Sequence, residues 1–284
     1  MSRKFRLGAA AASLALVVAA CGGGSSSDTG GETSDSTPVS TAELTFQPIS
    51  AGKLTVCSDA PYEPFEYQDE AGNWTGFDMD IMTAIAKRYG LTLEVTKQPF
   101  DGIWLAPAAG TCDVVASSIT ITEERSQNAL FSDAYFDANQ SLLVRAEDAE
   151  TYIDLESMAG KTIAVQTGTT GESYAKENAG SAKIQSFDDA SAMFLALESG
   201  QVDGVLQDFP INAYRAVKQE GKTKVSATFV TDEQYGFAMA KDNTALNDAI
   251  NESLNEFRAT GVYDEIFAKY FGSGDDEVTE EEGE

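Results

Sequence analysis

Strand-like and helix-like apolar patterns alternate along the middle of the chain, and this alternation restricts the possible folds more than any other feature. Residues 54–58 form a short apolar run of strand length, and apolar side chains then recur at every third or fourth position from Phe77 to Tyr89, just before Gly90. The first pattern predicts a strand, and the second predicts a helix that ends at a glycine C-cap. Strands that alternate with helices are typical of parallel sheets, so the pattern predicts an α/β fold.

The alternation occurs twice along the chain. In the first unit, further strands are predicted at residues 91–95 and 113–118, with a short helix at 101–109 between them. The second unit repeats the pattern with three strands and two helices, at residues 162–166, 184–187 and 202–207 and at residues 170–178 and 188–199. Two similar units predict two lobes, and the last two helices, at residues 245–259 and 262–271, must pack on one of them.

The N-terminus has the features of an export signal. Basic residues between positions 3 and 6 precede an unbroken apolar run at residues 9–20, which stops at Cys21. The run is too short to span a bilayer, and the small residues before Cys21 resemble the cleavage box of bacterial lipoproteins. We therefore expect residues 1–20 to be a signal peptide and Cys21 to become the lipidated first residue. The alternative is an ordinary signal peptide that happens to contain a cysteine.

Two segments outside the alternating patterns are polar. Residues 21–40 are rich in Gly, Ser, Thr and Asp, which predicts a disordered, flexible tether. Residues 273–284 form an acidic tail, which contributes to a formal net charge of -27. A charge of this sign and size affects solubility and the steering of ligands, and it argues against nucleic acid as a partner.

The chain contains no histidine and only three cysteines, one of which is Cys21. This composition argues against zinc chemistry and against Ser/His or Cys/His catalysis, so we expect no metal and no cofactor. Two further cysteines in an exported protein favour a disulfide. However, the predicted strands place Cys57 near the C-terminal end of one strand and Cys112 at the start of its neighbour, so the sequence leaves this bond open.

Polar residues follow the predicted strands at the edge where open α/β sheets bind ligands, outside the carboxyl ends of the strands. They are Ser58, Asp59 and Tyr62 after the first strand, Ser117, Ser118, Thr120 and Arg125 after the third, and Thr169, Thr170 and Asp208 in the second unit. An arginine, hydroxyl groups and a helix N-terminus suit a carboxylate, whereas an aspartate suits an ammonium group. This edge therefore suits a ligand that carries both groups.

Five segments of the chain, in this order, resemble the family 3 extracellular solute-binding proteins of ABC transporters for polar and basic amino acids. They are DAPYEPFE at residues 59–66, GFDMD at 76–80, SSITITEER at 117–125, GTT at 168–170 and QD at 207–208. The resemblance runs from residue 53 to residue 272 and rests on the five segments together. It implies a type II periplasmic-binding-protein-like fold, in which two parallel-sheet lobes are joined by two hinge crossings.

The resemblance also implies where the lobes divide. The crossings are expected near residues 136–140 and 231–235. The first lobe is then discontinuous, with residues 41–137 and 234–272, and the second lobe comprises residues 138–233. Closure of the lobes about these crossings would enclose the ligand, and a membrane permease would distinguish the closed form from the open one.

Residue by residue, the resemblance assigns roles at both ends of an amino acid. Arg125 matches the residue that clamps the α-carboxylate, and Thr170 matches a second carboxylate contact from the facing lobe. Ser118 and Thr120 match positions that bind the carboxylate and the α-ammonium group, and Asp208 matches the ammonium acceptor. Without the resemblance, Asp208 is read as a helix N-cap and Arg125 as a solvated helix charge.

The remaining matches concern the side chain of the ligand. Tyr62 and Phe100 match the two apolar surfaces that sandwich its aliphatic part, and Ser117 reaches toward it. Asp59 matches a position that accepts from the distal cation in members that bind basic ligands. Because the family usually has a proline two positions earlier than this chain has it, the role of Trp104 is left open.

Together these observations predict a monomeric binding protein, lipid-anchored on the extracytoplasmic face of the cell membrane, and not an enzyme. It would capture a free polar or basic L-amino acid and deliver it to the permease of an ABC importer. Asp59 and the two rings favour arginine, lysine or ornithine, whereas Ser117 and Gln166 suit glutamine equally well. The alternatives are a dehydratase with Glu63 or Glu66 as general acid, and a partner that reports the ligand to a receptor.

Overall fold

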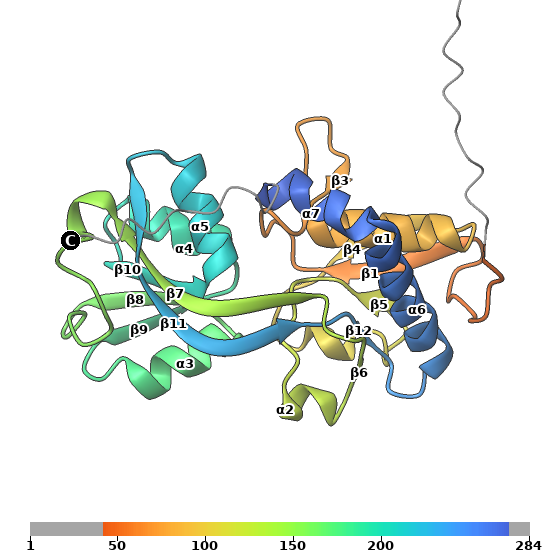
Figure 1. Cartoon of the computed structure of the whole chain (residues 1–284). Helices are drawn as coiled ribbons and strands as arrows, with labels where there is room; N and C mark the ends of the chain where they lie inside the picture. Colours follow the sequence, from red (N-terminus) through yellow and green to blue (C-terminus); the bar gives the residue numbers. More distant parts are fainter. Residues whose placement is uncertain (1–41, 273–284) are drawn as a thin grey trace, which may run out of the picture. The chain divides into compact units, whose positions relative to one another are not determined.

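The computed structural model describes residues 42–272, which form two five-stranded sheets with helices packed on them (Figure 1). The expected signal peptide at 1–20, Cys21 with its tether at 21–40, and the acidic tail at 273–284 lie outside these residues. Between residues 42 and 272, no helix combines the length and the apolar character that a membrane span requires.

The first sheet has the strand order β4-β1-β5-β12-β6. Its strands are Lys53–Ser58 (β1), Thr92–Lys97 (β4), Val114–Val115 (β5), Leu130–Phe131 (β6) and Ala238–Met239 (β12). β1 is parallel to β4 and β5, whereas β12 comes from late in the chain and is antiparallel to β5 and β6. We call this sheet, with the helices packed on it, the first lobe.

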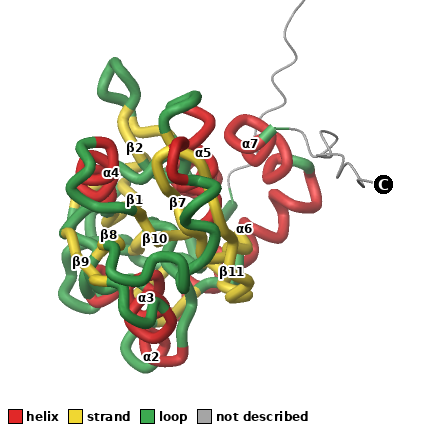
Figure 2. Tube along the Cα trace, turned by 90° about the vertical axis from the view of Figure 1, so that its left-hand side faces the viewer, coloured by secondary structure: helices red, strands yellow, loops and turns green. Residues whose placement is uncertain are grey.

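Three long helices belong to the first lobe, namely α1 at Phe77–Arg88, α6 at Thr244–Thr260 and α7 at Val262–Phe271. α6 and α7 lie side by side, as Figure 2 also shows, and both contact α1. The apolar stripe of α1, which includes Ile81 and Ile85, is fully buried in the core. The short elements of this lobe are β2 at Tyr67–Gln68, β3 at Trp74–Thr75, the 3-10 helix η1 at Ile103–Leu105 and α2 at Glu123–Ser126.

The second sheet has the order β11-β7-β10-β8-β9, and we call it, with its helices, the second lobe. Its strands are Phe136–Arg145 (β7), Thr162–Gln166 (β8), Lys183–Phe187 (β9), Gly204–Asp208 (β10) and Thr223–Tyr235 (β11). Its helices are α3 at Thr170–Asn178, α4 at Ala190–Glu198 and α5 at Phe209–Lys218, and a 3-10 turn, η2 at Ala146–Asp148, follows β7. β8 is parallel to β9 and β10.

The predicted α/β class is confirmed, and the predicted parallel pairs are present in both sheets, but each sheet also contains antiparallel strands that were not predicted. The reason lies in the connections between the lobes. The chain runs along β7 in one direction and returns along β11, so these two neighbouring strands are antiparallel, and β7 is also antiparallel to β10 (Figure 1). In the first lobe, the returning chain adds β12 in the same way.

Two predicted elements are shorter than expected. The helix expected at residues 101–109 is only the 3-10 turn η1, because Gly102 adopts a left-handed conformation with φ of 73° directly before it. The strand expected at residues 113–118 is limited to β5, and the chain then leaves the sheet. Ser118, with φ of 48°, turns the backbone at this point. This turn brings Ser117 and Ser118 to the edge of the sheet rather than into it.

β7 and β11 enter the first lobe through a cluster of aromatic rings. Tyr235 ends β11, pairs with Phe136 of β7, and makes a β-bridge to Thr120 of the first lobe. The ring centroid of Phe65 lies 4.9 Å from that of Phe136 and 5.5 Å from that of Tyr235. The two crossings are therefore anchored in the core of the first lobe by edge-to-face packing.

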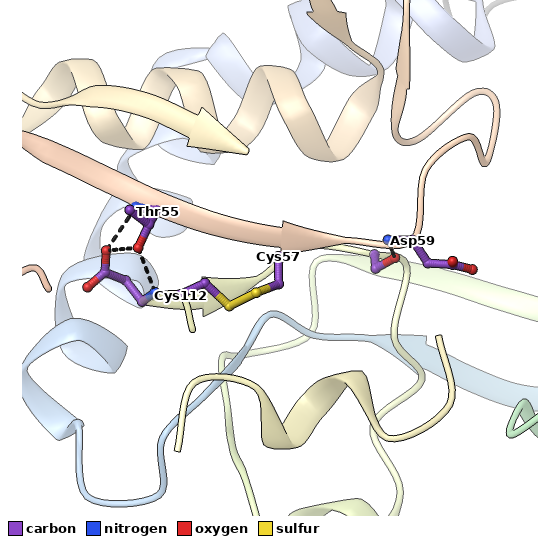
Figure 3. The surroundings of a disulfide bond; sticks show 6 residues. Thr55, Cys57, Asp59 and Cys112 are labelled. Atoms are coloured by element: carbon purple, nitrogen blue, oxygen red, sulfur yellow. Dashed lines mark hydrogen bonds between the residues drawn. A yellow bond between two sulfur atoms is a disulfide. The ribbon is translucent and has the colours of Figure 1, made fainter. Parts of the chain in front are cut away.

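The Cys57–Cys112 bond, which the sequence leaves open, is present (Figure 3). The backbone N–H of Asp113 donates to the Thr55 carbonyl oxygen at 2.9 Å, so the residue before Asp113 lies beside β1. The two cysteine Cα atoms are 5.8 Å apart, which is within the usual range for a disulfide. The bond ties β1, which carries Asp59 at its end, to the loop before β5.

Candidate ligand-binding site

A pocket lies at the carboxyl ends of β1, β8 and β10, and residues of both lobes line it. The lining residues are Asp59, Tyr62, Glu66, Phe100, Ser117, Ser118 and Thr120 from the first lobe, and Gln166, Thr169, Thr170, Gly171, Gln207 and Asp208 from the second. Every residue predicted to bind the ligand is among them except Arg125. The expectation that ligands bind outside the carboxyl ends of the strands thus identified most of the pocket from the sequence.

The two serines of the first lobe are held by buried carboxyl groups. Ser117 Oγ donates to Glu66 Oε1 at 3.0 Å, and Ser118 Oγ donates to Glu66 Oε2 at 3.2 Å. The Ser118 backbone N–H donates to Asp78 Oδ2 at 3.0 Å, and Tyr135 OH donates to the same oxygen at 2.8 Å. These contacts explain how Ser118 keeps its left-handed backbone conformation, and they fix the geometry of this side of the pocket.

Burial has a large effect on both carboxyl groups of this network. It raises the pKa of Asp78 to about 7, against the hydrogen bonds from Ser118 and Tyr135, which lower it. It also raises the pKa of Glu66 well above the usual range, and the neighbouring Asp78 adds to this increase. Asp78 does not itself line the pocket and acts on it through Ser118, from whose backbone N–H it accepts a hydrogen bond.

Asp59 directly follows β1 (Figure 3), and its side chain contacts Gln166 of the second lobe. Its backbone N–H donates to Ser117 Oγ at 2.9 Å, and its carboxyl Oδ2 accepts from Gln166 Nε2 at 2.5 Å. Burial raises the pKa of Asp59 to about 7, while the bond from Gln166 opposes that increase. Asp59 and Gln166 are thus a polar pair that crosses from one lobe to the other, with an acceptor on one side and an amide on the other.

Arg125 lies beside the pocket and does not line it. Its guanidinium donates to the carbonyl oxygens of Thr120 at 2.8 Å and of Gly168 at 3.0 Å, which belong to different lobes. The residue is 5% exposed, so the interpretation as a solvated helix charge is wrong. Burial lowers the pKa of Arg125, and the nearby carboxyl groups of Asp208 and Glu233 oppose this decrease. Among the described residues, no carboxylate forms an ion pair with Arg125.

Two aromatic rings pack against the Arg125 guanidinium. Its central carbon lies 4.7 Å from the ring centroid of Trp104 and 5.5 Å from that of Phe100. Such cation–π contacts stabilise the buried guanidinium and hold it against the two rings. Trp104, whose role the sequence left open, therefore contacts Arg125 without lining the pocket, whereas Phe100 contacts Arg125 and lines the pocket.

Asp208 ends β10, and its side chain is not a helix N-cap. Its Oδ1 atom accepts from Gln140 Nε2 at 2.5 Å, and its Oδ2 atom accepts from Tyr235 OH. Burial raises the pKa of Asp208 to about 7, and the negative charge of Glu233 adds to this increase. The N-cap interpretation is therefore wrong for the side chain, which is directed at the pocket and at the crossing strands.

Thr170 begins α3, and Thr169 caps that helix by accepting from the Glu172 backbone N–H at 3.0 Å. The Thr170 hydroxyl donates to Glu233 Oε2 at 2.6 Å, and Thr120 donates to the same oxygen at 2.7 Å. Sequence reasoning missed Glu233. Its only signal was its position in a predicted hinge crossing, which does not by itself say where a side chain points.

Comparison with known proteins agrees with this geometry. The family described as bacterial extracellular solute-binding proteins, family 3, matches residues 54–273. A Neisseria gonorrhoeae protein named "Probable histidine-binding protein" is 35% identical over 221 residues, which are 76% of this chain and 82% of that protein. An ancestral arginine-binding protein, with structures bound to arginine and to glutamine, has a TM-score of 0.74 and 38% identity, and the match covers 78% of this chain and 99% of that one.

A third match is to a binding protein that is described as the precursor of an enzyme. The crystal structure of the ancestral amino acid-binding protein AncCDT-1, a precursor of cyclohexadienyl dehydratase, has a TM-score of 0.73 and 36% identity, and the match covers 78% of this chain and 96% of that one. The family match extends over both lobes and includes the whole pocket. The chain therefore belongs to the bacterial extracellular solute-binding proteins of family 3.

Proposed function

We propose that the chain binds one free L-amino acid in this pocket and acts as the lipid-anchored, solute-capturing component of an ABC importer. The observation that carries the proposal is Arg125, which is buried beside the pocket and, within residues 42–272, donates only to carbonyl oxygens. A buried guanidinium with no carboxylate partner is costly, and the carboxylate of a ligand reduces that cost through charge-assisted hydrogen bonds.

The two ends of an amino acid have complementary places in this arrangement. The carboxylate would bind Arg125 and the backbone N–H groups at the start of α3, where the helix dipole favours a negative charge. The ammonium group would bind Asp208, at the end of β10. Because these groups come from different lobes, the bound ligand favours the arrangement in which the lobes are close, and the permease would recognise that arrangement.

The side chain of the ligand would extend toward Asp59, between Tyr62 and Phe100. A buried carboxyl group at the end of an apolar slot favours a cationic end group, so arginine, lysine or ornithine fits better than a neutral amino acid. Gln166, which already donates to Asp59, is the feature that suits glutamine instead. The relatives support both choices, because the ancestral arginine-binding protein has structures with either ligand.

The test is calorimetric titration of the purified protein with L-arginine, L-lysine, L-ornithine, L-histidine and L-glutamine. We expect one molecule to bind per chain and a basic amino acid to bind more tightly than glutamine. The proposal fails if none of the five amino acids binds.

The membrane anchor has a separate test. Cys21→Ser should release the protein from the membrane fraction and leave its affinity for the amino acid unchanged, because Cys21 lies far along the chain from the pocket residues. Retention of the variant in the membrane fraction would contradict lipid anchoring. It would leave the binding proposal untouched.

A dehydratase is the second candidate, and Glu66 is the observation that favours it. Burial raises its pKa, which is the direction that a general acid requires, and it lines the pocket. Glu63, the other residue considered for this role, instead pairs with Lys218 at 2.8 Å and does not line the pocket. Incubation with prephenate distinguishes the candidates, because only a dehydratase would consume it.

A further inference from the structure

We propose that Glu233 is a positioning residue that holds the hydroxyl protons of Thr120 and Thr170, so that both oxygens face the pocket as acceptors and select for a ligand ammonium group. The inference rests on the proposed function, because it concerns how the same pocket distinguishes an amino acid from a carboxylic acid without the amine. It also changes the role of Thr170, whose hydroxyl was expected to contact the ligand carboxylate.

The Glu233 carboxylate lies between hydroxyl groups from different lobes. Its Oε2 atom accepts from Thr120 Oγ1 at 2.7 Å and from Thr170 Oγ1 at 2.6 Å, and the two hydroxyl oxygens are 3.4 Å apart. A threonine hydroxyl has one proton and two lone pairs. Because each proton is donated to Glu233, only lone pairs remain for a ligand. Lone pairs accept from the N–H groups of an ammonium and repel a carboxylate.

Gln140 of β7 connects Glu233 to the proposed ammonium acceptor. Its Nε2 atom donates to Glu233 Oε1 at 2.9 Å and to Asp208 Oδ1 at 2.5 Å. Its two short contacts are thus to carboxyl groups, and a third, long contact of 3.5 Å reaches Thr170 Oγ1. Asp208, Thr120 and Thr170 line the pocket, so the three form a surface of acceptors, which matches the three N–H donors of a primary ammonium group.

The backbone of β11 aims Glu233 at this place. The pairing of β11 with β7 shifts in register twice, first between Val225 and Ala227 and again after Phe229, and it resumes at Glu233 opposite Ala138. Asp232, directly before Glu233, has φ of 51°. An irregularity of this kind redirects the following side chain, and here it directs Glu233 toward the contact between the lobes rather than along the face of the sheet. Asp232 itself is exposed, whereas Glu233 is half-buried.

The test uses Glu233→Gln and the matched control Asp232→Asn, which removes the same charge one residue earlier, away from the two threonines. Calorimetry would compare L-arginine with 5-guanidinopentanoate, and L-glutamine with glutaramate, because each second compound lacks only the α-amine. The amide of Glu233→Gln donates protons and so frees a threonine proton to point into the pocket. We expect it to weaken binding of both amino acids about 10- to 100-fold, and to change binding of both analogues less than about threefold.

Asp232→Asn should leave all four affinities unchanged. An equal loss for amino acids and analogues in Glu233→Gln would overturn the inference, because a structural defect at the crossing weakens every ligand alike. No loss at all would overturn it as well. If circular dichroism shows that Glu233→Gln does not fold, Thr170→Val carries the test, since it deletes one acceptor and should give the same selective loss. A wild-type protein that binds neither amino acid contradicts the proposed function itself.

Discussion

The two lobes contribute to the pocket in different ways. In the first lobe, the pocket residues are fixed from within, since Ser117 and Ser118 bond to Glu66 and the Cys57–Cys112 disulfide ties β1 to the loop before β5. In the second lobe, Asp208 and Thr170 bond to side chains of the crossing strands β7 and β11, namely Gln140, Tyr235 and Glu233. The first lobe is thus a preformed half-site, whereas the second half depends on how the crossings are placed.

This difference suggests that the two lobes have different roles in ligand binding. A ligand that meets the first lobe finds its contacts already in place, so this lobe should determine the intrinsic affinity for the ligand. The polar contacts between the lobes, from Gln166 to Asp59 and from Arg125 to the Gly168 carbonyl oxygen, must rearrange when a ligand enters. The second lobe should therefore determine how binding is coupled to the arrangement of the lobes.

The largest effect is expected at the first-lobe clamp. Arg125→Ala should lower the affinity for an amino acid at least about 100-fold, because two or more charge-assisted hydrogen bonds worth about 1.5–3 kcal/mol each are lost. Calorimetry with L-arginine measures this. Arg145→Ala is the matched control in the second lobe, since Arg145 also donates to two carbonyl oxygens but lies outside the pocket. Near-normal affinity in Arg125→Ala would remove Arg125 from the site.

The disulfide should matter for stability in the first lobe alone. Replacing Cys57 and Cys112 by alanine should lower the free energy of unfolding by about 2–5 kcal/mol, because the unfolded chain gains the freedom that the cross-link removed. Hydrogen exchange should show lost protection in β1 and β5 and little change in β8 and β10. Equal loss of protection in both lobes would contradict the expectation that the disulfide stabilises the first lobe alone.

Asp59 tests whether the preformed half-site also selects the side chain. Asp59→Asn keeps the shape and removes the charge, so arginine should bind about 1–3 kcal/mol more weakly, whereas glutamine should bind about as well or better. Calorimetry with both ligands on both proteins gives opposite results for the two ligand classes. Unchanged arginine affinity in a folded variant would rule out the cation pocket and leave the contacts to the α-amino and α-carboxylate groups in place.

The last predicted effect, about tenfold for each carboxyl group, is a dependence on pH. The pKa values of Asp59 and Asp208 are both raised to about 7, so each must lose a proton before it can bind a cation. Affinity for arginine should therefore rise as the pH increases from 6 to 8 and level off above that, by about tenfold for each carboxyl group that titrates. The chain has no histidine to titrate in this range. In Asp59→Asn the slope should fall by half, and an unchanged slope would exclude Asp59 as its source.

Much of this site could be predicted because its residues carry local signals. Asp59, Ser117 and Asp208 follow strands that the apolar pattern reveals, and Thr170 begins a helix whose bounds, Thr170–Asn178, match the prediction. Because the carboxyl ends of parallel strands lie at one edge of a sheet, such residues can be expected to lie together without any knowledge of the packing.

The rest depends on contacts that no local pattern encodes. Glu233 and Gln140 lie on strands that cross between the lobes. The register shift in β11 between Phe229 and Glu233 precedes the contacts of Glu233 with the two threonines, and no local sequence pattern reveals this shift. Likewise, the sequence left the Cys57–Cys112 bond open because strand ends alone did not reveal how the loop before β5 runs beside β1. The mixed sheets have the same cause, since the direction of β7 follows from the return of the chain along β11.

The central claim is that the pocket recognises an amino acid by its carboxylate and ammonium groups at once, and wild-type protein is enough to test it. Calorimetric titrations should compare L-arginine with agmatine, which lacks only the carboxylate, and with 5-guanidinopentanoate, which lacks only the amine. The account predicts one-to-one binding of L-arginine and affinities at least about 10-fold lower for both analogues, since each loses charge-assisted hydrogen bonds. Agmatine or 5-guanidinopentanoate binding as tightly as L-arginine would contradict it.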